Sequence, residues 1–383
     1  MVSIDSKLAQ EIVERTMKII PFNVNVMDAR GMIVGSGEGA RIGEVHAGAQ
    51  LALARGETVE IELPDSRNMP GSRPGVNLPM TVRGALCGVV GLTGDPRVVR
   101  QFGELVRITA EMILEQAQLL GELQREKRYR EEFVFHLVNQ ENTSRADLEA
   151  WALRLDIDFD VPRAVLVLNL TEEELPTDQA LKELQRCQTQ LAIRQPEALT
   201  AVISPREMAI LKVFDDRALR KPRQIMAREE LAALAAALER ESGRLCSLAM
   251  GVALPGIEGV PLSYQSACKT YRVGRQRCPE KRLFSFYDLS LPVLLASLGS
   301  GWQGEQLRRP LQGLNAADKR GAMLRRTLDV WFAQNGHAAA AANALHIHRN
   351  TLDYRLNQIE EATGLDLGNT DDRLLLYVAL QLD

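Results

Sequence analysis

The stretch "HIHRNTLDYRLNQIEEATGLDL", residues 346–367, determines how the end of the chain folds. Apolar side chains recur there at spacings of four and three, at Leu352, Leu356 and Ile359. That spacing places them on one side of an α-helix, which we expect to span residues 349–363 and to end at the following glycine. An alanine-rich helix and a tight turn precede it. This order of short helix, turn and long helix is typical of a helix-turn-helix.

The outward side of this helix carries side chains that suit DNA. Arginine pairs with guanine edges, asparagine and glutamine pair with adenine, and hydroxyl groups reach phosphates. The amino-terminal end of a helix also attracts a phosphate oxygen. The side chains that periodicity places on this outward side, and that we therefore expect to reach double-stranded DNA, are Asn350, Thr351, Tyr354, Arg355 and Gln358.

The charge of this region leaves an alternative open. Between residues 318 and 383 acidic side chains outnumber basic ones, so a small helical bundle with a solvated polar face also fits. Without a broad basic patch, the positive charge that binds DNA must be local. The three histidines His337, His346 and His348 are spread across the predicted turn, and that spacing does not favour a metal site.

A resemblance to a known group rests on this region. Residues 347–367, followed by "DDRLLLYVALQL" at residues 371–382, closely resemble the PucR-type C-terminal helix-turn-helix of the purine-catabolism and sugar-diacid group of bacterial transcriptional regulators. The resemblance implies that Leu352, Leu356 and Ile359 form the core. The residues that it implies for contacts with bases and phosphates are Arg349, Asn350, Thr351, Tyr354 and Arg355.

The amino-terminal region has the pattern of a small sensor domain. We expect a helix near residues 6–19, a hairpin from "NVNVMD" and "MIVGSG", a helix near residues 45–54, and further antiparallel strands from "TVEIEL", "VNLPMTV" and "ALCGVVGLTG". This order predicts a sheet with helices on one face, as in PAS-like sensor folds. Glycines let the backbone approach a ligand, while Arg41 can clamp a carboxylate and His46 can donate to it. Both side chains also fit an ordinary surface or hydrogen-bonded role.

Four segments carry a second resemblance: "NVNVMDARGMIVGSG", "RIGEVHAGA", "RPGVNLPMTV" and "GVVGLTGDP". They are similar to the sugar-diacid recognition domain of the carbohydrate diacid regulators over most of residues 4–118. The resemblance implies a small hydroxylated mono- or diacid such as glucarate, galactarate or glycerate as effector. The segment "EGA", residues 38–40, departs from the aspartate-containing turn usual in the family. The residues implied for acid binding are Arg41, His46 and Asn77, with Ser36, Gly37, Gly91 and Thr93 lining the pocket.

A long helix is expected to follow the sensor, from about residue 98 to residue 138. An apolar stripe on it predicts either a dimer seam in its first half or ordinary packing on its own domain. The two alternatives have equal support. The stripe consists of Phe102, Val106, Ile113, Leu120 and Leu123.

The middle of the chain alternates strands and helices over residues 160–290, in an order that resembles the nucleotide-cyclase fold of diguanylate cyclases. The Gly-Gly-Asp-Glu-Phe loop of those enzymes is replaced by "SPREM", residues 204–208, where only Glu207 is in register. Acidic residues 172–174 follow the first strand, which lacks the expected metal-binding aspartate. Phosphoryl chemistry needs both the glycines and paired acids for Mg²⁺. We therefore predict a degenerate GGDEF-like α/β domain without cyclase activity.

The whole chain of 383 residues is predicted to be a multidomain α+β protein with an ordinary globular composition. The expected parts are a PAS-like sensor (1–118), a helical linker (119–159), the degenerate GGDEF-like domain (160–290) and an all-α helical domain (291–383) whose helix-turn-helix spans about 321–383. Five scattered cysteines and the lack of a long apolar run indicate a cytoplasmic protein that does not enter the membrane.

These parts predict a ligand-responsive transcriptional regulator, acting as an activator of genes for hydroxy-acid uptake or catabolism and working as a homodimer or a higher homo-oligomer. We expect no catalytic residues, metal or cofactor. The alternatives are a nucleotide-cyclase-related enzyme and an acid-sensing scaffold that does not bind DNA.

Overall fold

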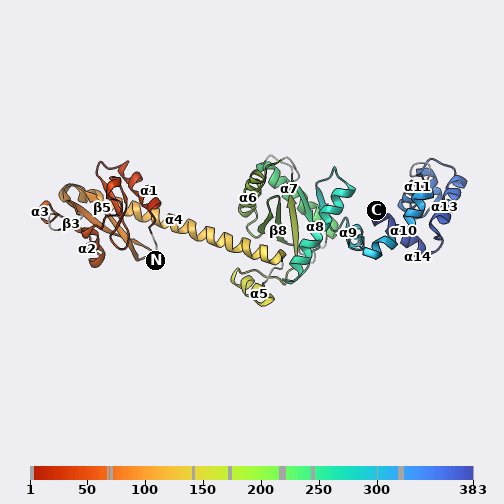
Figure 1. Ribbon diagram of the computed structural model, residues 1–383, viewed down its shortest axis with the longest axis horizontal. Coiled ribbons are helices and arrows are strands. Elements are labelled where there is room, and N and C mark those ends of the chain that lie inside the picture. The colour runs from red at the N-terminus through yellow and green to blue at the C-terminus, as the bar shows by residue number, and fades with distance from the viewer. Residues whose placement is uncertain are drawn as a thin grey trace. The chain divides into compact units, whose positions relative to one another are not determined.

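Short apolar runs separated by turns fold into two five-stranded sheets, one in each of two compact units, Met1–Arg128 and Tyr129–Asp383 (Figure 1). The computed structural model describes residues 4–66, 69, 72–139, 143–170, 175–214, 221–242, 246–299, 301–317 and 323–382. The units are described separately below.

The first unit is an antiparallel sheet with strand order β2-β1-β5-β4-β3. The β4–β5 turn is tight because Arg83 and Gly84 both adopt the left-handed conformation, with φ of 50° and 77°. The elements are α1 (Ser6–Met17), β1 (Val24–Met27), β2 (Ile33–Ser36), the 3-10 helix η1 (Gly39–Arg41), α2 (Ala47–Arg55), β3 (Val59–Ile61), α3 (Leu63–Ser66), β4 (Gly75–Val82), β5 (Ala85–Thr93) and α4 (Pro96–Asn139), which continues beyond the unit.

Helices cover both faces of this sheet. Residues of α1 and α4 pack with Val26, Val76 and Val90 on one face, while α2 packs with Met27 and Val89 on the other. The expectation that helices cover one face was therefore wrong. The physical reason is that the central strands are buried on both sides, so neither face tolerates water.

The second unit begins with the end of α4 and contains a mixed sheet with strand order β10-β9-β6-β8-β7. Helices α6 and α7 cover one face, and α8 with the end of α4 covers the other. The elements are α5 (Arg145–Arg154), β6 (Arg163–Asn169), α6 (Thr177–Arg194), β7 (Leu199–Ser204), β8 (Glu207–Val213), α7 (Arg223–Ser242), β9 (Ser247–Met250), α8 (Gly259–Arg277) and β10 (Leu283–Ser285).

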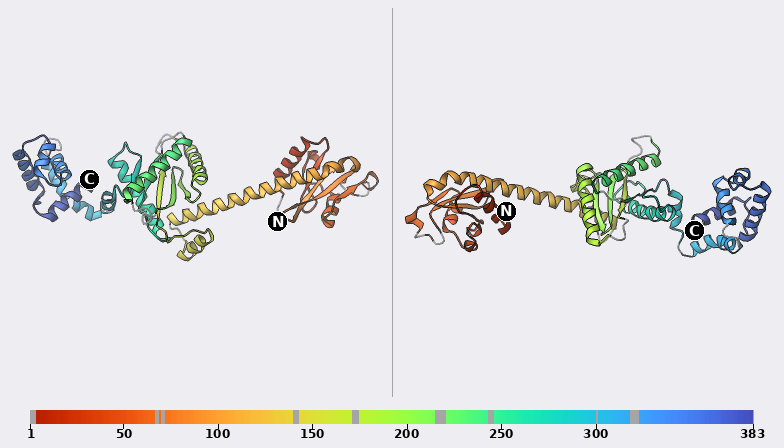
Figure 2. Two further views of the ribbon diagram at one scale, coloured as in Figure 1. Left: turned by 180° about the vertical axis from the view of Figure 1, so that it is seen from behind. Right: turned by 90° about the horizontal axis from the view of Figure 1, so that it is seen from above.

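The rest of the second unit is helical (Figure 2). Its own apolar core includes Leu314, Leu328, Leu352 and Leu376. The helices are α9 (Ser290–Ala296), α10 (Gly301–Ala317), α11 (Met323–Ala333), α12 (Ala338–Ala344), α13 (Arg349–Thr363) and α14 (Thr370–Leu382).

The apolar stripe expected on the long helix packs on the helix's own domain instead of forming a dimer seam. Val106 and Ile113 are buried in the core beneath α4, and Phe102 packs against that core, whereas Leu120 and Leu123 are half exposed. A dimer seam made of the first three residues was therefore the wrong alternative. Within the described ranges, no helix combines the length and apolar character that a membrane span needs.

Candidate functional site

A row of polar side chains crosses the sensor sheet on the face toward α2. The strand register pairs Gly91 of β5 with Asn25 of β1 on one side and with Asn77 of β4 on the other. The same row continues to Ser36 of β2 and Val59 of β3. Both asparagines and the serine are at least 97% buried. Buried polar groups are costly unless they are hydrogen-bonded, so this row indicates a built polar site rather than ordinary core.

Two glycines allow the backbone to pack closely against this row. A Cβ atom at Gly91 would lie 3.1 Å from Oδ1 of Asn77 and 3.2 Å from Cε of Met27. A Cβ atom at Gly48, in the first turn of α2, would lie 2.9 Å from Nδ2 of Asn77 and 3.1 Å from Cε1 of His46. Since any other residue at these positions would crowd the same amide, the glycines bring α2 and the central strand close to the polar row.

One end of the row is already ordered by hydrogen bonds. The Ser36 hydroxyl donates to Oδ1 of Asn25 over 2.7 Å and accepts from the backbone N–H of Glu38 over 3.0 Å. The Asn25 amide in turn lies 3.5 Å from Oγ1 of Thr93, to which it donates. These contacts fix the orientation of the Asn25 amide before any ligand arrives.

His46 caps the amino-terminal end of α2. Its Nδ1 accepts a hydrogen bond from the backbone N–H of Ala49 at 3.1 Å, so the ring proton is on Nε2, which is then a donor. Burial, the larger cause, and the nearby charge of Arg41 together lower the pKa of His46 to about 4. The ring is therefore neutral at pH 7.

Arg41 brings a buried positive charge to the same region. Its side chain is 6% exposed, and its Nε lies 3.4 Å from Oε2 of Glu44, whose side chain is 50% exposed. The charge of this guanidinium acts on His46, whose pKa it helps to lower, so the two side chains lie near one another. Arg41 and His46 together form a donor pair suited to a carboxylate.

Most of the predicted effector residues lie in this region of the sheet. The exception is Gly37, where a Cβ atom would meet Oδ1 of Asn23 at 2.3 Å and Sδ of Met17 at 2.4 Å, so packing against α1 explains that glycine. The sequence interpretation missed Asn25 and Gly48. A signal for Asn25 was present, because an asparagine alternates with valines in a strand that is buried throughout. The residues that the structure gathers are Ser36, Arg41, His46, Asn77, Gly91 and Thr93.

The carboxyl-terminal helices have the expected helix-turn-helix arrangement. His346, with φ of 55°, turns the chain between α12 and α13, and His348 caps α13 by accepting from the N–H of Asn350. Leu352 and Ile359 are fully buried on the inner side of α13. The outer side is consequently fixed in orientation by the core.

The predicted DNA contacts are mostly exposed on that outer side. Tyr354 is 63% exposed, and the Arg349 side chain is 71% exposed, 3.9 Å from the carboxylate of Asp353. Arg355 is placed differently, because it is half buried and its Nη1 donates to Oγ1 of Thr327 on α11 over 3.3 Å. Asp353 and Asn357 are also exposed on the side of Asn350 and Tyr354, at spacings of three and four residues, and were not among the predicted contacts.

The β7–β8 hairpin lies where a cyclase would have its catalytic loop, and its one acid in register is hydrogen-bonded to another side chain. Ser204 pairs with Glu207 across the β7–β8 turn, as expected from the sequence. Oε1 of Glu207 accepts a hydrogen bond of 2.5 Å from the Tyr264 hydroxyl on α8. This bond and burial raise the pKa of Tyr264, with burial the larger cause. The acidic residues 172–174 lie outside the described residues.

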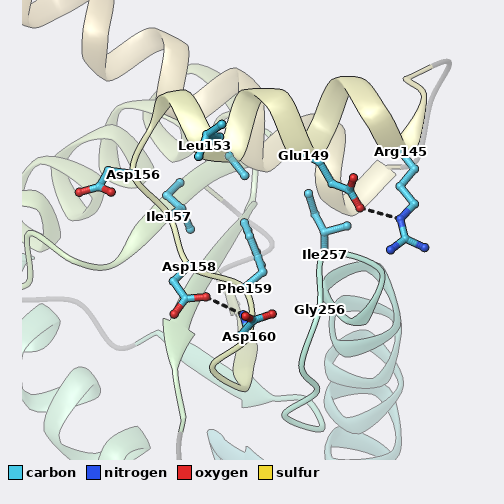
Figure 3. Close-up of a pocket in the computed structure, with 11 residues that line it drawn as sticks. Arg145, Glu149, Leu153, Asp156, Ile157, Asp158, Phe159, Asp160, Gly256 and Ile257 are labelled. Carbon is cyan, nitrogen blue, oxygen red and sulfur yellow. Dashed lines mark hydrogen bonds and ion pairs between the residues drawn. The ribbon is translucent and has the colours of Figure 1, made fainter.

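A cavity of about 450 Å³ lies elsewhere in the second unit, between α5 and the loop that leads into β6 (Figure 3). Arg145 there bonds to Glu149, and the side chain of Asp158 accepts from the N–H of Asp160. Among the residues that the structure describes, no group of acidic, histidine and cysteine side chains has the arrangement of a metal site. This cavity is separate from the sensor row and from α13.

Family models match three parts of the chain. The sugar diacid recognition model matches residues 4–137, the GGDEF-like domain model matches residues 140–273, and the PucR C-terminal helix-turn-helix model matches residues 324–382. The polar row, the degenerate hairpin and α13 lie within these three matches respectively.

Full-length relatives decide the family. The chain is 46% identical to the carbohydrate diacid regulator of Escherichia coli K12, with 99% of this chain and 98% of that protein covered. The chain belongs to the carbohydrate diacid regulator family. It is also 35% identical to an uncharacterised Haemophilus influenzae protein, over 99% of each chain, and 26% identical to the uncharacterised Bacillus subtilis protein YsfB, over 97% of this chain and 96% of that one.

The chain is therefore a transcriptional regulator of this family, with a sugar diacid recognition region, a GGDEF-like middle domain and a DNA-binding helix-turn-helix of the PucR type. The expectations of the family, the middle domain and the carboxyl-terminal domain are confirmed.

Proposed function

We propose that the sensor binds a small hydroxylated acid, such as glucarate, galactarate or glycerate, in a PAS-like domain over residues 1–118. The observation that carries the proposal is the buried polar row centred on Gly91, next to the neutral His46 and the charged Arg41. The strand order β2-β1-β5-β4-β3 supports the PAS-like description. The name of the E. coli relative, a carbohydrate diacid regulator, points to the same class of ligand.

The chemistry of the row suits both ends of such a ligand. A carboxylate accepts from the Arg41 guanidinium and from Nε2–H of His46. The amide of Asn77 can donate to and accept from a ligand hydroxyl, and Gly91 places no side chain against that amide. A diacid without hydroxyls would offer no partner to the buried amide of Asn77, which costs binding free energy. The site therefore prefers hydroxy acids to simple diacids.

The output of the proposed sensor is DNA binding by two copies of the chain in the cytoplasm. Arg349, Asn350, Thr351 and Tyr354 contact an operator half-site through the exposed side of α13, and Arg355 supports them from its position against α11. The bound acid changes the relative population of two dimer arrangements, and thereby the spacing of the two helices on paired half-sites. In this proposal the protein activates genes for uptake or catabolism of the acid.

The middle domain is proposed to be structural, without cyclase activity. Glu207 is the only acid in register with the catalytic loop, and it is bonded to Tyr264. A carboxylate held in this way is not available for Mg²⁺, and the loop lacks the glycines that admit phosphates. The alternative of a nucleotide-cyclase-related enzyme is therefore disfavoured.

Calorimetric titration of the full chain tests the sensor proposal. Glucarate, galactarate and glycerate are compared with adipate, a diacid of similar length without hydroxyls. We expect saturable binding of at least one hydroxy acid, and a loss of about 10-fold or more in Gly91→Ala, because the added methyl group enters the space beside Asn77. Arg41→Ala should abolish acid binding and leave DNA affinity without acid unchanged.

Gly39→Ala is the matched control, since a Cβ atom there would meet no atom within 4 Å. It should bind the acid as the wild type does. Equal binding of adipate, or unchanged affinity in Gly91→Ala, would remove the polar row from the effector site.

A further inference from the structure

Glu38, in the segment that departs from the usual family pattern, has a partner that the proposed function does not use. Its carboxylate accepts a hydrogen bond from Nη1 of Arg73 over 2.7 Å. Arg73 lies 35 residues further along the chain, just before β4, so this ion pair joins two separate segments of the sensor. The two side chains are 43% and 48% exposed. Water screens such a pair, which therefore adds little to stability and is easily exchanged for another partner.

Glu38 is attached to the polar row at its Ser36 end. The backbone N–H of Glu38 donates to Oγ of Ser36 over 3.0 Å, and that hydroxyl is bonded to Asn25 within the row. The backbone carbonyl of Glu38 accepts from the N–H of Arg41 over 2.9 Å. Glu38 therefore follows the end of the row directly, and it is bonded to Arg41 through its backbone and to Arg73 through its carboxylate.

Arg73 is attached to the row at its Asn77 end. The residue before it, Ser72, accepts a hydrogen bond at Oγ from the backbone N–H of Gly48 over 3.1 Å. Gly48 packs against the amide of Asn77, since a Cβ atom on this glycine would come within 2.9 Å of Nδ2. The Glu38–Arg73 pair therefore bridges the two polar ends of the row.

The pair also shows that Arg73 can bind a carboxylate next to the row, because Glu38 supplies one. A guanidinium presents its donors in a planar fork, and a carboxylate can occupy two of them at once. The bond to Glu38 runs from Nη1. A ligand carboxylate that binds the fork with both oxygens gains a second bond, and the exposed pair that it replaces costs little to break.

We propose that Arg73 binds the second carboxylate of a hydroxylated diacid whose first carboxylate lies at Arg41 and His46, and that this ligand displaces the Glu38 side chain. This role of Arg73 rests on the proposed function, because it concerns the same acid site. Arg73 is then a specificity-determining residue, since a monoacid binds at Arg41 and leaves the Glu38–Arg73 pair intact. Glu38 competes with the diacid for Arg73 and so lowers diacid affinity.

Calorimetric titration of the full chain tests this role with glucarate and galactarate. Each is compared with its matching monoacid, gluconate or galactonate, in which an alcohol replaces one carboxylate. Arg73→Ala should weaken diacid binding by about 10-fold, as expected for the loss of a hydrogen bond between charged groups, and leave monoacid binding unchanged. Glu38→Gln should strengthen diacid binding by about 2- to 5-fold, because it removes the competing carboxylate.

Arg100→Ala is the matched control. Arg100 forms a similar exposed ion pair with Glu60 of β3 over 2.8 Å. Glu60 alternates with Val59 and Ile61, which pack on the face toward α2, so this pair lies on the other face of the sheet. The substitution removes the same charge without changing the polar row, and it should leave the affinities for diacid and monoacid unchanged.

Several results would overturn this role of Arg73 and leave the proposed acid site standing. They are unchanged diacid binding in Arg73→Ala, equal losses of diacid and monoacid binding in that variant, an equal loss in Arg100→Ala, or binding of monoacids alone by the wild type. A wild type that binds none of these acids would contradict the proposed function itself, and the role of Arg73 with it.

Discussion

Acid should destabilise the sensor through His46. Burial, reinforced by the charge of Arg41, lowers the pKa of this imidazole to about 4 in the folded protein, against an ordinary value near 6.5 in the unfolded chain. The unfolded chain therefore binds the proton first as the pH falls. The contribution of His46 to the free energy of unfolding is therefore fully present above pH 6.5 and is lost as the pH falls toward 4. At pH 5 the linkage relation gives a loss of about 2 kcal/mol in the free energy of unfolding relative to pH 7.5.

His46→Asn isolates this effect. Asparagine keeps a side-chain oxygen that can accept from the first turn of α2 in place of Nδ1, but it does not titrate. At pH 7.5 the variant should retain most of the wild-type free energy of unfolding. Between pH 7.5 and pH 5 its free energy of unfolding should fall by about 2 kcal/mol less than that of the wild type.

Hydrogen exchange is the suitable assay, because the first 128 residues contain no tryptophan or tyrosine to report on the sensor. Mass spectrometry of peptides that cover α2 gives the opening free energy at each pH after correction for intrinsic exchange rates. Equal declines in the wild type and in His46→Asn would refute the reasoning, since another group would then carry the pH dependence.

Three further predictions concern other parts of the chain. Arg349→Ala should weaken specific DNA binding by about 1 to 3 kcal/mol if the side chain contacts a base. Arg272→Ala, on the exposed side of α8, is the control and should leave DNA binding unchanged. Equal losses on specific and random duplexes would make Arg349 a phosphate contact. Gly121→Ala, in a partly exposed helical position where the methyl group meets only Arg125 at 3.9 Å, should raise the free energy of unfolding by about 0.5 to 1 kcal/mol in urea titrations. Tyr264→Phe should cost about 1.5 to 3 kcal/mol by removing the bond to Glu207, as measured by tryptophan fluorescence of the second unit, and a neutral result would mean that this bond has little net value.

Much of the fold could be predicted from local patterns. The hairpin of β1 and β2, the "RG" turn before β5 and the cap of α13 at Gly364 follow from turn chemistry and helix periodicity, and the structure confirms them. The partner of α4 could not be predicted in the same way. Its helix has two apolar sides, and periodicity alone does not say which one packs on the sheet.

The candidate site shows the same division. Arg41, His46 and Asn77 were identified through a family resemblance, and their proximity depends on strand register and on the position of α2. Asn25 could be added to the site only once the strand register was known, because its alignment with Gly91 on the neighbouring strand is a long-range property of the sheet. Arg355 was predicted from its helical face, but a contact with Thr327 on another helix holds it against the core.

In the proposed function, an acid bound to the sensor changes the DNA affinity of the carboxyl-terminal helices. Fluorescence anisotropy measures this change on a duplex that the protein selects from a random pool, titrated with and without the hydroxy acid that calorimetry identifies. We expect a shift in DNA affinity of about 5- to 150-fold, with an equal shift in acid affinity when DNA is bound. Identical DNA affinity with the acid site saturated would contradict this expectation.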